Sequence, residues 1–387
     1  MLCSAGDFYG GSDAYNEPKS HFVAEMMNYF QYDAIAVGET DLGYGLAVLM
    51  EDRDRYDLNL VCANLFQKIN GDRNRLKRAF PDYRIVSRAG LKIGFIGLLS
   101  PTTKPGVKTM QGGEVEALTY IIKDPTPLVP DLIKKVRKKC DVLVLLAHME
   151  RHELEQFLPD YPEVDIAILG HSERTQKTEQ PYLIGTVPVY MASHQGQYVG
   201  RLKTTLGPDL KIADRNNKLY FLEASYADEP IVAELVSAFQ AEYKLIQKEL
   251  YAQDMLQRSR RSAEHADTYL GVGSCLTCHE SAFEVYRQTT HARAYETLAR
   301  QFRHRDSNCI GCHSVGYNQP GGFEGIRIIG DMVDLVDVQC EACHGPGADH
   351  NRDGSYLKLA KESCVNCHNE DQDPNFDYAE AWKKIAH

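Results

Sequence analysis

A pentapeptide of the form Cys-x-x-Cys-His occurs four times in the last third of this 387-residue chain. The copies are CLTCH, CIGCH, CEACH and CVNCH, beginning at Cys275, Cys309, Cys340 and Cys364. Two thiols three residues apart can each form a thioether with one vinyl group of a haem, and the histidine that follows can then bind the iron. The repeats therefore predict four covalently attached c-type haems.

The predicted attachment residues are the eight cysteines and four histidines of these motifs: Cys275, Cys278, His279, Cys309, Cys312, His313, Cys340, Cys343, His344, Cys364, Cys367 and His368. Zinc ribbons and disulfides are alternatives, because paired cysteines also form closed zinc sites and cross-links. Neither alternative explains why a histidine follows every second cysteine.

Composition narrows the class of protein. The net charge is −11 and no basic stripe stands out, which argues against a nucleic-acid partner. No apolar run approaches the roughly 20 residues of a membrane helix, so we expect no membrane span. Because c-type haems are attached outside the cytoplasm and Met1 leads straight into LCSAGDF, we expect an export signal upstream of Met1 and a periplasmic or extracellular location.

Residues 1–207 alternate strand-like and helix-like runs. The apolar runs Ile93 to Leu99 and Val142 to Ala147 have the length of strands buried on both faces. Helices are expected at Pro18 to Gln31 and at Leu128 to Lys139, where apolar residues recur on one side. The pattern predicts an α/β domain.

Polar residues fall at the carboxyl ends of several predicted strands, where α/β sheets place their sites. They are Asp7 in AGD, Glu39 in GETD, His148 in AHME, and His171 and Glu173 in GHSE. Carboxylates and imidazoles are metal ligands, so these residues are candidates for a site holding one divalent metal, Mn, Zn or Ca.

The same motifs, together with TVPVYMASHQGQYVGRLKTTL, resemble the metallophosphoesterase domain of the 5'-nucleotidase family. The resemblance covers residues 1–207 and implies a four-layer α/β sandwich. It also implies a two-metal site that activates a hydroxide and clamps a phosphate.

Several family positions are altered in this chain. The family's Asp-x-His strand is absent, Glu39 replaces an asparagine, and Thr40 replaces the catalytic histidine. Threonine cannot protonate a leaving group as an imidazolium does. Glu173 changes the charge at the last ligand position. We therefore expect a catalytically degenerate domain, a pseudoenzyme; the alternative is a bifunctional metal-dependent phosphohydrolase or nucleotidase.

Residues 208–265 are predicted to form a hairpin followed by a long connecting helix that starts near Pro230 and runs to about Arg261. Its apolar positions recur every three or four residues and predict packing against a neighbouring domain; a dimer helix is the alternative. Residues 266–387 then carry all four motifs, which leaves little side-chain material for a conventional core. The porphyrins must supply much of the buried surface, and such crowded rings lie close enough to exchange electrons.

This region resembles the tetrahaem c-type cytochromes that accept electrons from hydroxylamine oxidation. The resemblance rests on YLGVGSCLTCH, HARAYETL, CIGCHSVGY, VQCEACHGPGADH and the closing CVNCH with DPNFDYAEAWKKIAH. It implies that His291, His350 and His387 are distal haem ligands. The fourth iron is then five-coordinate, or takes His304 or His265.

Together these features predict an exported electron-transfer cytochrome fused to a degenerate phosphoesterase-like domain, with other redox proteins as partners. Two rivals remain. An open haem could act on a small nitrogen or sulfur oxide. Alternatively, the chain could be an oligomer or a subunit of a larger redox assembly.

Overall fold

The computed structural model describes residues 1–10, 16–69, 72–102, 120–171, 179–192, 196–208, 211–223, 225–262, 268–301, 303–304, 306–325, 327–329, 332–354, 361–369 and 372–387. The chain divides into two compact units, Met1–Pro230 and Ile231–His387. This boundary falls inside the predicted connecting region. Within the described ranges, no helix combines the length and apolar character that crossing a bilayer requires.

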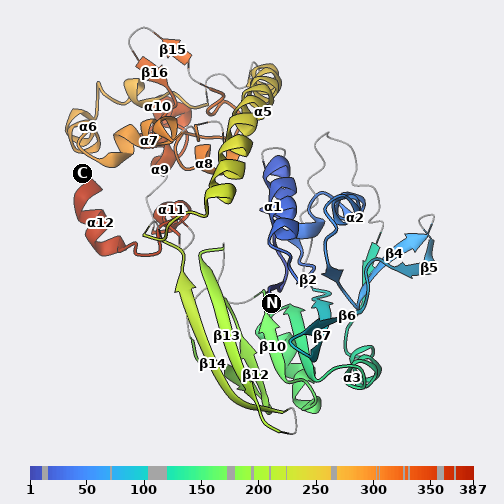
Figure 1. Ribbon diagram of the computed structural model, residues 1–387. Helices are drawn as coiled ribbons and strands as arrows, with labels where there is room; N and C mark the ends of the chain where they lie inside the picture. The colour runs from blue at the N-terminus through green and yellow to red at the C-terminus, as the bar shows by residue number, and fades with distance from the viewer. Residues whose placement is uncertain are drawn as a thin grey trace. The chain divides into compact units, whose positions relative to one another are not determined.

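The first unit contains two main sheets (Figure 1). Strands β1 (Cys3–Ser4), β2 (Ala34–Ala36) and β3 (Leu60–Val61) form a parallel sheet in that order. The larger sheet has the order β11-β12-β10-β9-β7-β6, with β6 (Tyr83–Arg88), β7 (Leu91–Leu99), β9 (Val142–His148), β10 (Ile166–Leu169), β11 (Tyr182–Ile184) and β12 (Val187–Tyr190). Strands β7, β9, β10 and β12 are parallel, and the edge strands β6 and β11 are antiparallel.

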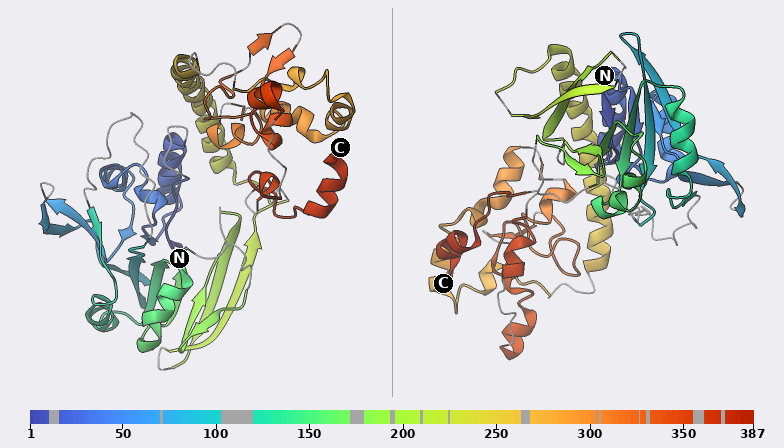
Figure 2. Two further views of the ribbon diagram at one scale, coloured as in Figure 1. Left: turned by 180° about the vertical axis from the view of Figure 1, so that it is seen from behind. Right: turned by 90° about the horizontal axis from the view of Figure 1, so that it is seen from below.

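Smaller elements surround these sheets. A third sheet has the order β5-β4-β8, with β4 (Leu65–Ile69), β5 (Asp72–Arg78) and β8 (Tyr120–Ile122). Strands β13 (Tyr198–Leu206) and β14 (Ile212–Phe221) form a long hairpin, visible in both views of Figure 2. The helical elements are α1 (Glu17–Tyr29), η1 (Thr40–Leu42), α2 (Leu46–Arg55), α3 (Val129–Arg137), α4 (Arg151–Phe157) and η2 (Leu158–Asp160).

The two main sheets pack face to face, with helices on the outside. In β9, Val142 and Val144 pack in a cluster shared with β2 and β3, whereas Leu143 and Leu145 pack in a cluster shared with α3 and α4. Alternate residues of a strand point to opposite faces, so β9 is covered on both. The opposite face of the β1-β2-β3 sheet packs against α1 and α2. The predicted four-layer α/β sandwich is confirmed.

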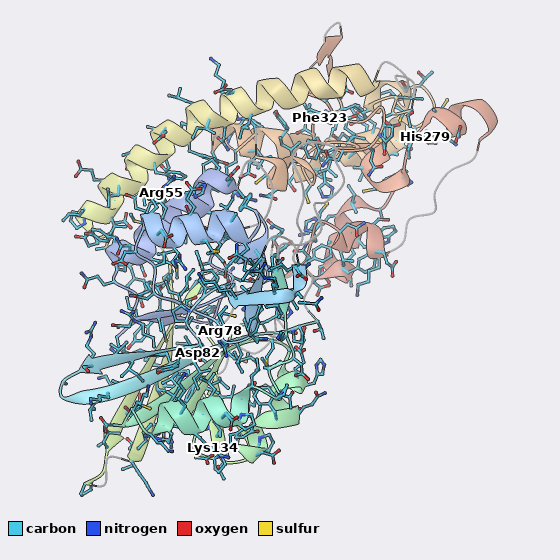
Figure 3. The ribbon with its side chains drawn as sticks, turned by 90° about the vertical axis from the view of Figure 1, so that its right-hand side faces the viewer. Arg55, Arg78, Asp82, Lys134, His279 and Phe323 are labelled. Atoms are coloured by element: carbon cyan, nitrogen blue, oxygen red, sulfur yellow. The ribbon has the colours of Figure 1, made fainter. Side chains whose placement is uncertain are left out.

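Helix α3 shows why the sequence folds this way locally. Leu132, Ile133 and Val136 are buried, while Lys134 and Lys135 between them are exposed. Figure 3 labels Lys134. Proline in the first turn and basic residues in the last turn suit the two ends of a helix. Apolar burial on one face therefore fixes α3 against the larger sheet.

The second unit is built from helices, most of them short. The predicted long helix is α5 (Pro230–Ser262). The remaining elements are η3 (Val272–Ser274), α6 (Glu280–Tyr286), η4 (Thr290–Arg293), α7 (Ala294–Arg300), α8 (Ser307–Ile310), β15 (Arg327–Ile329), β16 (Met332–Asp334), α9 (Cys340–His344), α10 (Ala348–Asp353), α11 (Lys361–Val365) and α12 (Tyr378–Ile385). In the described part of this unit, the buried apolar cluster is small and centres on Tyr295 and Phe323, the latter labelled in Figure 3.

Candidate metal centre and haem sites

Four of the polar residues predicted at the sheet edge come within reach of a single ion. Asp7 follows β1, Glu39 follows β2, His148 ends β9, and His171 follows β10. Each offers one ligand atom, and these atoms all lie within 4.8 Å of one another. Parallel strands bring their carboxyl ends together, which accounts for the cluster. Glu173 lies outside the described residues.

Both histidines of this cluster contact the carboxylate of Glu39. Nε2 of His148 lies 2.5 Å from Oε2 of Glu39 and 3.4 Å from Oδ2 of Asp7. Nδ1 of His171 lies 2.9 Å from the other oxygen of Glu39. On its opposite side, Nδ1 of His148 lies 2.7 Å from the carbonyl oxygen of Ala5, which fixes the ring orientation.

Two glycines allow the backbone to approach closely enough for these contacts. A Cβ on Gly38 would lie 2.1 Å from Oδ1 of Asp7, and a Cβ on Gly170 would lie 2.1 Å from the carbonyl oxygen of Ala5. Asp7 itself has a φ of 57°, a conformation uncommon outside glycine. The turn after β1 is thus held in a strained form that presents the Asp7 carboxylate to the cluster.

The loop after β2 is tied down by Thr40 and Asp41. The fully buried carboxylate of Asp41 accepts hydrogen bonds from the backbone N–H groups of Asp7, Tyr9 and Gly38 at 3.0, 3.0 and 2.7 Å. Burial, assisted by the charge of Asp7, raises the pKa of Asp41 to about 7. The Thr40 hydroxyl donates to the carbonyl of Tyr9 at 2.9 Å. Thr40 therefore serves the loop and offers no acid to a ligand.

The charges of the cluster balance one another. Burial alone lowers the pKa of His148, but interactions with Asp7 and Glu39 outweigh burial and raise it to about 10. The hydrogen bond to Glu39 raises the pKa of His171. Burial acts to raise the pKa of Glu39, but the two histidines outweigh it and hold that pKa well below its usual range. A metal ion binds the neutral form of an imidazole, so the interactions with Asp7 and Glu39 that favour the charged form of His148, and that with Glu39 for His171, oppose metal binding here.

Glu150 also belongs to this site and was not predicted. Its Oε1 lies 3.1 Å from Nε2 of His171. The same side chain caps α4 in a reciprocal capping box with Glu153. The sequence signal was the acidic residue placed just before a helix and two residues after His148. Two imidazoles with carboxylates fit Zn²⁺ or Mn²⁺; they fit Ca²⁺, which takes oxygen ligands, less well.

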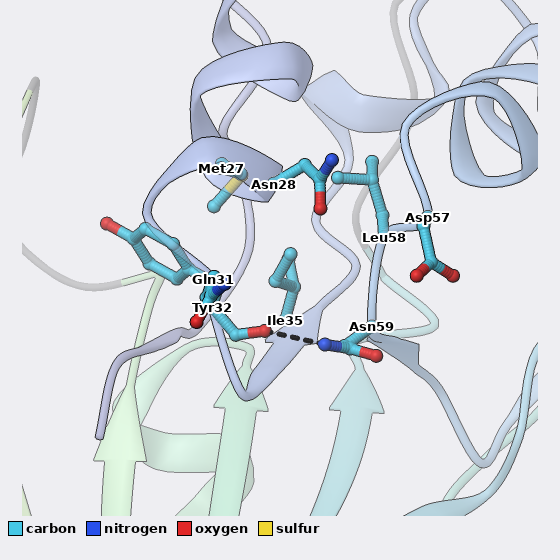
Figure 4. Close-up of a pocket in the computed structure, with 8 residues that line it drawn as sticks. All are labelled: Met27, Asn28, Gln31, Tyr32, Ile35, Asp57, Leu58 and Asn59. Carbon is cyan, nitrogen blue, oxygen red and sulfur yellow. Dashed lines mark hydrogen bonds between the residues drawn. The ribbon is translucent and has the colours of Figure 1, made fainter. Parts of the chain in front are cut away.

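A small pocket on this unit is separate from the metal cluster. Its lining residues are Met27, Asn28, Gln31, Tyr32, Ile35, Asp57, Leu58 and Asn59 (Figure 4). Asn59 donates a hydrogen bond of 2.7 Å to the carbonyl of Tyr32 across it. Most of these residues precede β2 and β3, so the pocket lies at the amino ends of the strands. No cluster ligand lines it.

In the second unit, three of the four motif histidines face another histidine, with ring centres 5.9–6.0 Å apart. The facing pairs are His279 with His350, His368 with His291, and His344 with His387. Two imidazoles on opposite sides of one metal ion, each with a ring nitrogen about 2 Å away, have centres roughly 6 Å apart. The residues present therefore fit three irons, each held between two imidazoles.

In the pair formed by His368 and His291, the ring of His368 is held by two further contacts. Nδ1 of His368 lies 2.9 Å from Oδ2 of Asp373, and the His368 ring stacks on Phe376 with centres 4.5 Å apart. This leaves Nε2 of His368 as the nitrogen for a metal. Burial, then the charge of His368, lowers the pKa of His291, which favours the neutral form that binds metal.

His313 has different surroundings. Its Nδ1 lies 2.6 Å from the carbonyl oxygen of Ala294, an arrangement that orients a ligating imidazole. Among the ring contacts of the described residues, none joins His313 to a second histidine. His304 lies instead beside Tyr295, with ring centres 6.3 Å apart. His265 lies outside the described residues.

Cysteines of different motifs are neighbours. The interacting thiols connect the motifs in the order first, third, fourth, second: Cys275 with Cys340, Cys343 with Cys364, and Cys367 with Cys312. The hydrogen bond between Cys275 and Cys340 lowers the pKa of Cys340 to about 7, and that between Cys367 and Cys312 does the same for Cys312. The predicted attachment cysteines of motifs that follow one another in this order are therefore neighbours.

Comparison with known proteins gives different matches for the N-terminal and the C-terminal region of the chain. Residues 274–345 match a family model described as cytochrome c554 and c-prime. The C-terminal region matches a cytochrome c family. This match implies haem c as the cofactor and redox proteins as partners. Cytochrome c-554 of Nitrosomonas europaea is 31% identical, over 24% of this chain and 47% of that protein.

The N-terminal region resembles 5'-nucleotidases. That of Vibrio cholerae is 26% identical, over 52% of this chain and 40% of its own length. Sulfate thiohydrolase SoxB of Thermus thermophilus, solved with glycerol, shares the fold at a TM-score of 0.52 and 17% identity, over 62% of this chain and 42% of that one. The chain thus spans less than half of each of these three relatives. Both predicted resemblances are confirmed, and the two regions are fused in one chain.

Proposed function

We propose that this protein is an exported electron carrier that holds four c-type haems in its C-terminal region. The observation that supports this most directly is the three facing histidine pairs, with ring centres 5.9–6.0 Å apart. A second imidazole closes an iron to substrates and suits it to electron transfer. Each haem, when bound, supplies a one-electron couple.

Each motif has a defined role in this proposal. The four cysteine pairs attach the haems, and His279, His313, His344 and His368 are the proximal ligands. His350 is the distal ligand opposite His279, His387 opposite His344, and His291 opposite His368. The neighbouring thiols support a haem order of first, third, fourth and second, because each thioether would hold a haem edge near its cysteine. Electrons would follow that order, exchanged with other redox proteins.

The haem bound by His313 favours a second candidate function. Among the described residues no histidine ring faces His313, so an iron bound there would lack the second imidazole proposed at the other three sites. A small nitrogen or sulfur oxide could then react at this iron. Electron transfer remains the better-supported function, since three of the four motif histidines face a second imidazole.

We infer further that the N-terminal region, residues 1–207, is an inactive phosphoesterase-like domain joined through residues 208–265 to the haem domain, residues 266–387. The support is the use of the Thr40 hydroxyl within its own loop and the pairing of both histidines with Glu39. The competing function, a metal-dependent phosphohydrolase or nucleotidase, is favoured by the convergence of Asp7, Glu39, His148 and His171.

Low-temperature electron paramagnetic resonance of the full-length protein tests the haem assignment. We expect four added haems by mass, three low-spin irons and one high-spin iron. A high-spin signal that shifts with nitrite or nitric oxide would support the second candidate. Four low-spin irons would assign a distal ligand, such as His304 or His265, to the fourth haem. A polypeptide mass with no added haem would refute the proposal.

A hydrolysis assay tests the N-terminal domain. Purified protein is given Mn²⁺ or Zn²⁺ and a generic phosphate ester, and we expect no turnover above the metal-only background. Turnover that His148→Ala abolishes, and that His152→Ala leaves intact, would establish a phosphohydrolase. His152 is a suitable control because it is exposed on α4.

A further inference from the structure

The third haem motif contains a buried carboxylate with an unusual set of partners. Glu341 is 5% exposed. Its two oxygens accept hydrogen bonds from the backbone N–H groups of Leu270, at 3.0 and 3.1 Å, of Gly271 at 2.7 Å, and of Gly347 at 2.6 Å. Two of these donors lie just before the first motif, about 70 residues away in sequence. Glu341 therefore joins the first motif to the third.

Gln339 extends the same contact. It is 4% exposed, and its Oε1 accepts a hydrogen bond from the N–H of Val272 at 2.7 Å. Its Nε2 donates to the carbonyl of Val336 at 2.7 Å. Gln339 and Glu341 flank Cys340 and together hold residues 270–272, which lead through η3 into Cys275. This arrangement explains why the thiols of Cys275 and Cys340 are neighbours.

Packing alone does not account for a carboxylate at this position. A buried charge costs several kcal/mol unless hydrogen bonds compensate it. Here every partner of Glu341 is an N–H donor. An ionised carboxylate offers only acceptor oxygens and suits these partners, whereas an amide would place its own N–H donors against them. The charge remains buried beside two haem attachment sites. A negative charge in such a place stabilises ferric over ferrous iron.

We propose that Glu341 is a positioning residue for the haems of the first and third motifs, which fixes the spacing of their attachment segments and lowers the reduction potentials of both. This inference rests on the proposed haem attachment. With haems attached at these motifs, one electron would pass from ferrous iron at one site to ferric iron at the other, and the spacing that Glu341 fixes would help to set the rate.

The test is a redox titration of full-length holoprotein in which each iron is followed by its own resonance signal. In Glu341→Gln, we expect the ratio of reduced to oxidised iron at a fixed potential to rise on the order of tenfold at the two irons bound by His279 and His344. The matched control is Glu280→Gln, because Glu280 follows His279 directly but is exposed to solvent. That control should leave all four irons unchanged.

A second variant keeps the charge and displaces it slightly. A Cβ on Gly347 would lie 3.0 Å from Oε1 of Glu341, so Gly347→Ala forces the carboxylate to shift by a few tenths of an ångström. We expect a smaller change in the ratio of reduced to oxidised iron at the irons bound by His279 and His344. Unchanged potentials in both variants would overturn the inference, and so would an equal shift at all four irons, which would indicate general loosening. Absence of haem in the unaltered protein would instead refute the proposed function.

Discussion

The two units differ in what fills their interiors. The first unit buries three apolar clusters built from its own side chains, and its polar cluster is neutralised internally by Glu39, His148 and His171. The described part of the second unit has one small cluster around Phe323, and its paired histidines leave room for an ion between them. Side chains fill the interior of the first unit, whereas the paired histidines of the second unit are spaced to fit the irons of the proposed haems.

The largest effect should come from withholding haem. The full chain produced without haem attachment should lose ordered structure throughout the second unit, because the proposed porphyrins would supply much of its buried surface. The backbone amides of the first unit should stay equally protected from hydrogen exchange in both forms. Hydrogen exchange on the two forms of the full chain measures this. Equal protection of the second unit with and without haem would remove the contrast between the units.

The next largest effect concerns the polar cluster of the first unit. His148 is 1% exposed, and His148→Ala leaves Glu39 without its closest partner. We expect a loss of about 3 kcal/mol in the free energy of unfolding of this unit, as is usual when one member of a buried ion pair is removed. Chemical denaturation measures it, with exposed His152→Ala as the control. A loss equal to that of the control would mean that the pairing contributes nothing.

A distal-ligand variant should change chemistry and leave the fold intact. In His350→Ala, the iron bound by His279 loses its second imidazole, so one low-spin signal should become high-spin while haem content stays constant. His304→Ala should leave the number of low-spin irons unchanged, because His304 faces Tyr295. The opposite pattern for these two variants would contradict the proposed pairing.

The smallest effect should follow from Asp373→Asn. Asp373 contacts Nδ1 of His368 and is partly exposed, so its charge is screened by solvent. Weakening this contact should raise the potential of that iron slightly, by less than Glu341→Gln raises its two irons. A redox titration of both variants shows which substitution shifts the reduction potentials more. A larger shift in Asp373→Asn would mean that ligand support outweighs buried charge in setting these potentials.

Much of the architecture was accessible from the sequence because apolar periodicity is strong where strands are buried. The run Val142 to Ala147 predicted β9, and the apolar stripe after Pro230 predicted α5. The β4–β5 hairpin was missed because β5, Asp72–Arg78, is polar along most of its length and mostly exposed. Alternation of apolar and polar residues carries no signal in such a strand.

The candidate sites, too, could be predicted only in part from the sequence. Motif spacing predicted the attachment residues, which stay a prediction. Strand ends pointed to Asp7, Glu39, His148 and His171, which the structure brings together. The pairing of each proximal histidine with a distal one was not predictable, because His291 and His368 are far apart in sequence. Glu341 was hidden for another reason. Its partners are backbone N–H groups, which any sequence supplies.

The order of the haem motifs in space has a consequence for how the protein is made. Motif two is synthesised before motif four, yet motif four is its neighbour in the thiol contacts. In a chain that ends before motif four, the proposed haem at Cys312 would lack its described neighbour at Cys367. We therefore expect a product truncated before Cys364 to hold that haem apart from those of the first and third motifs.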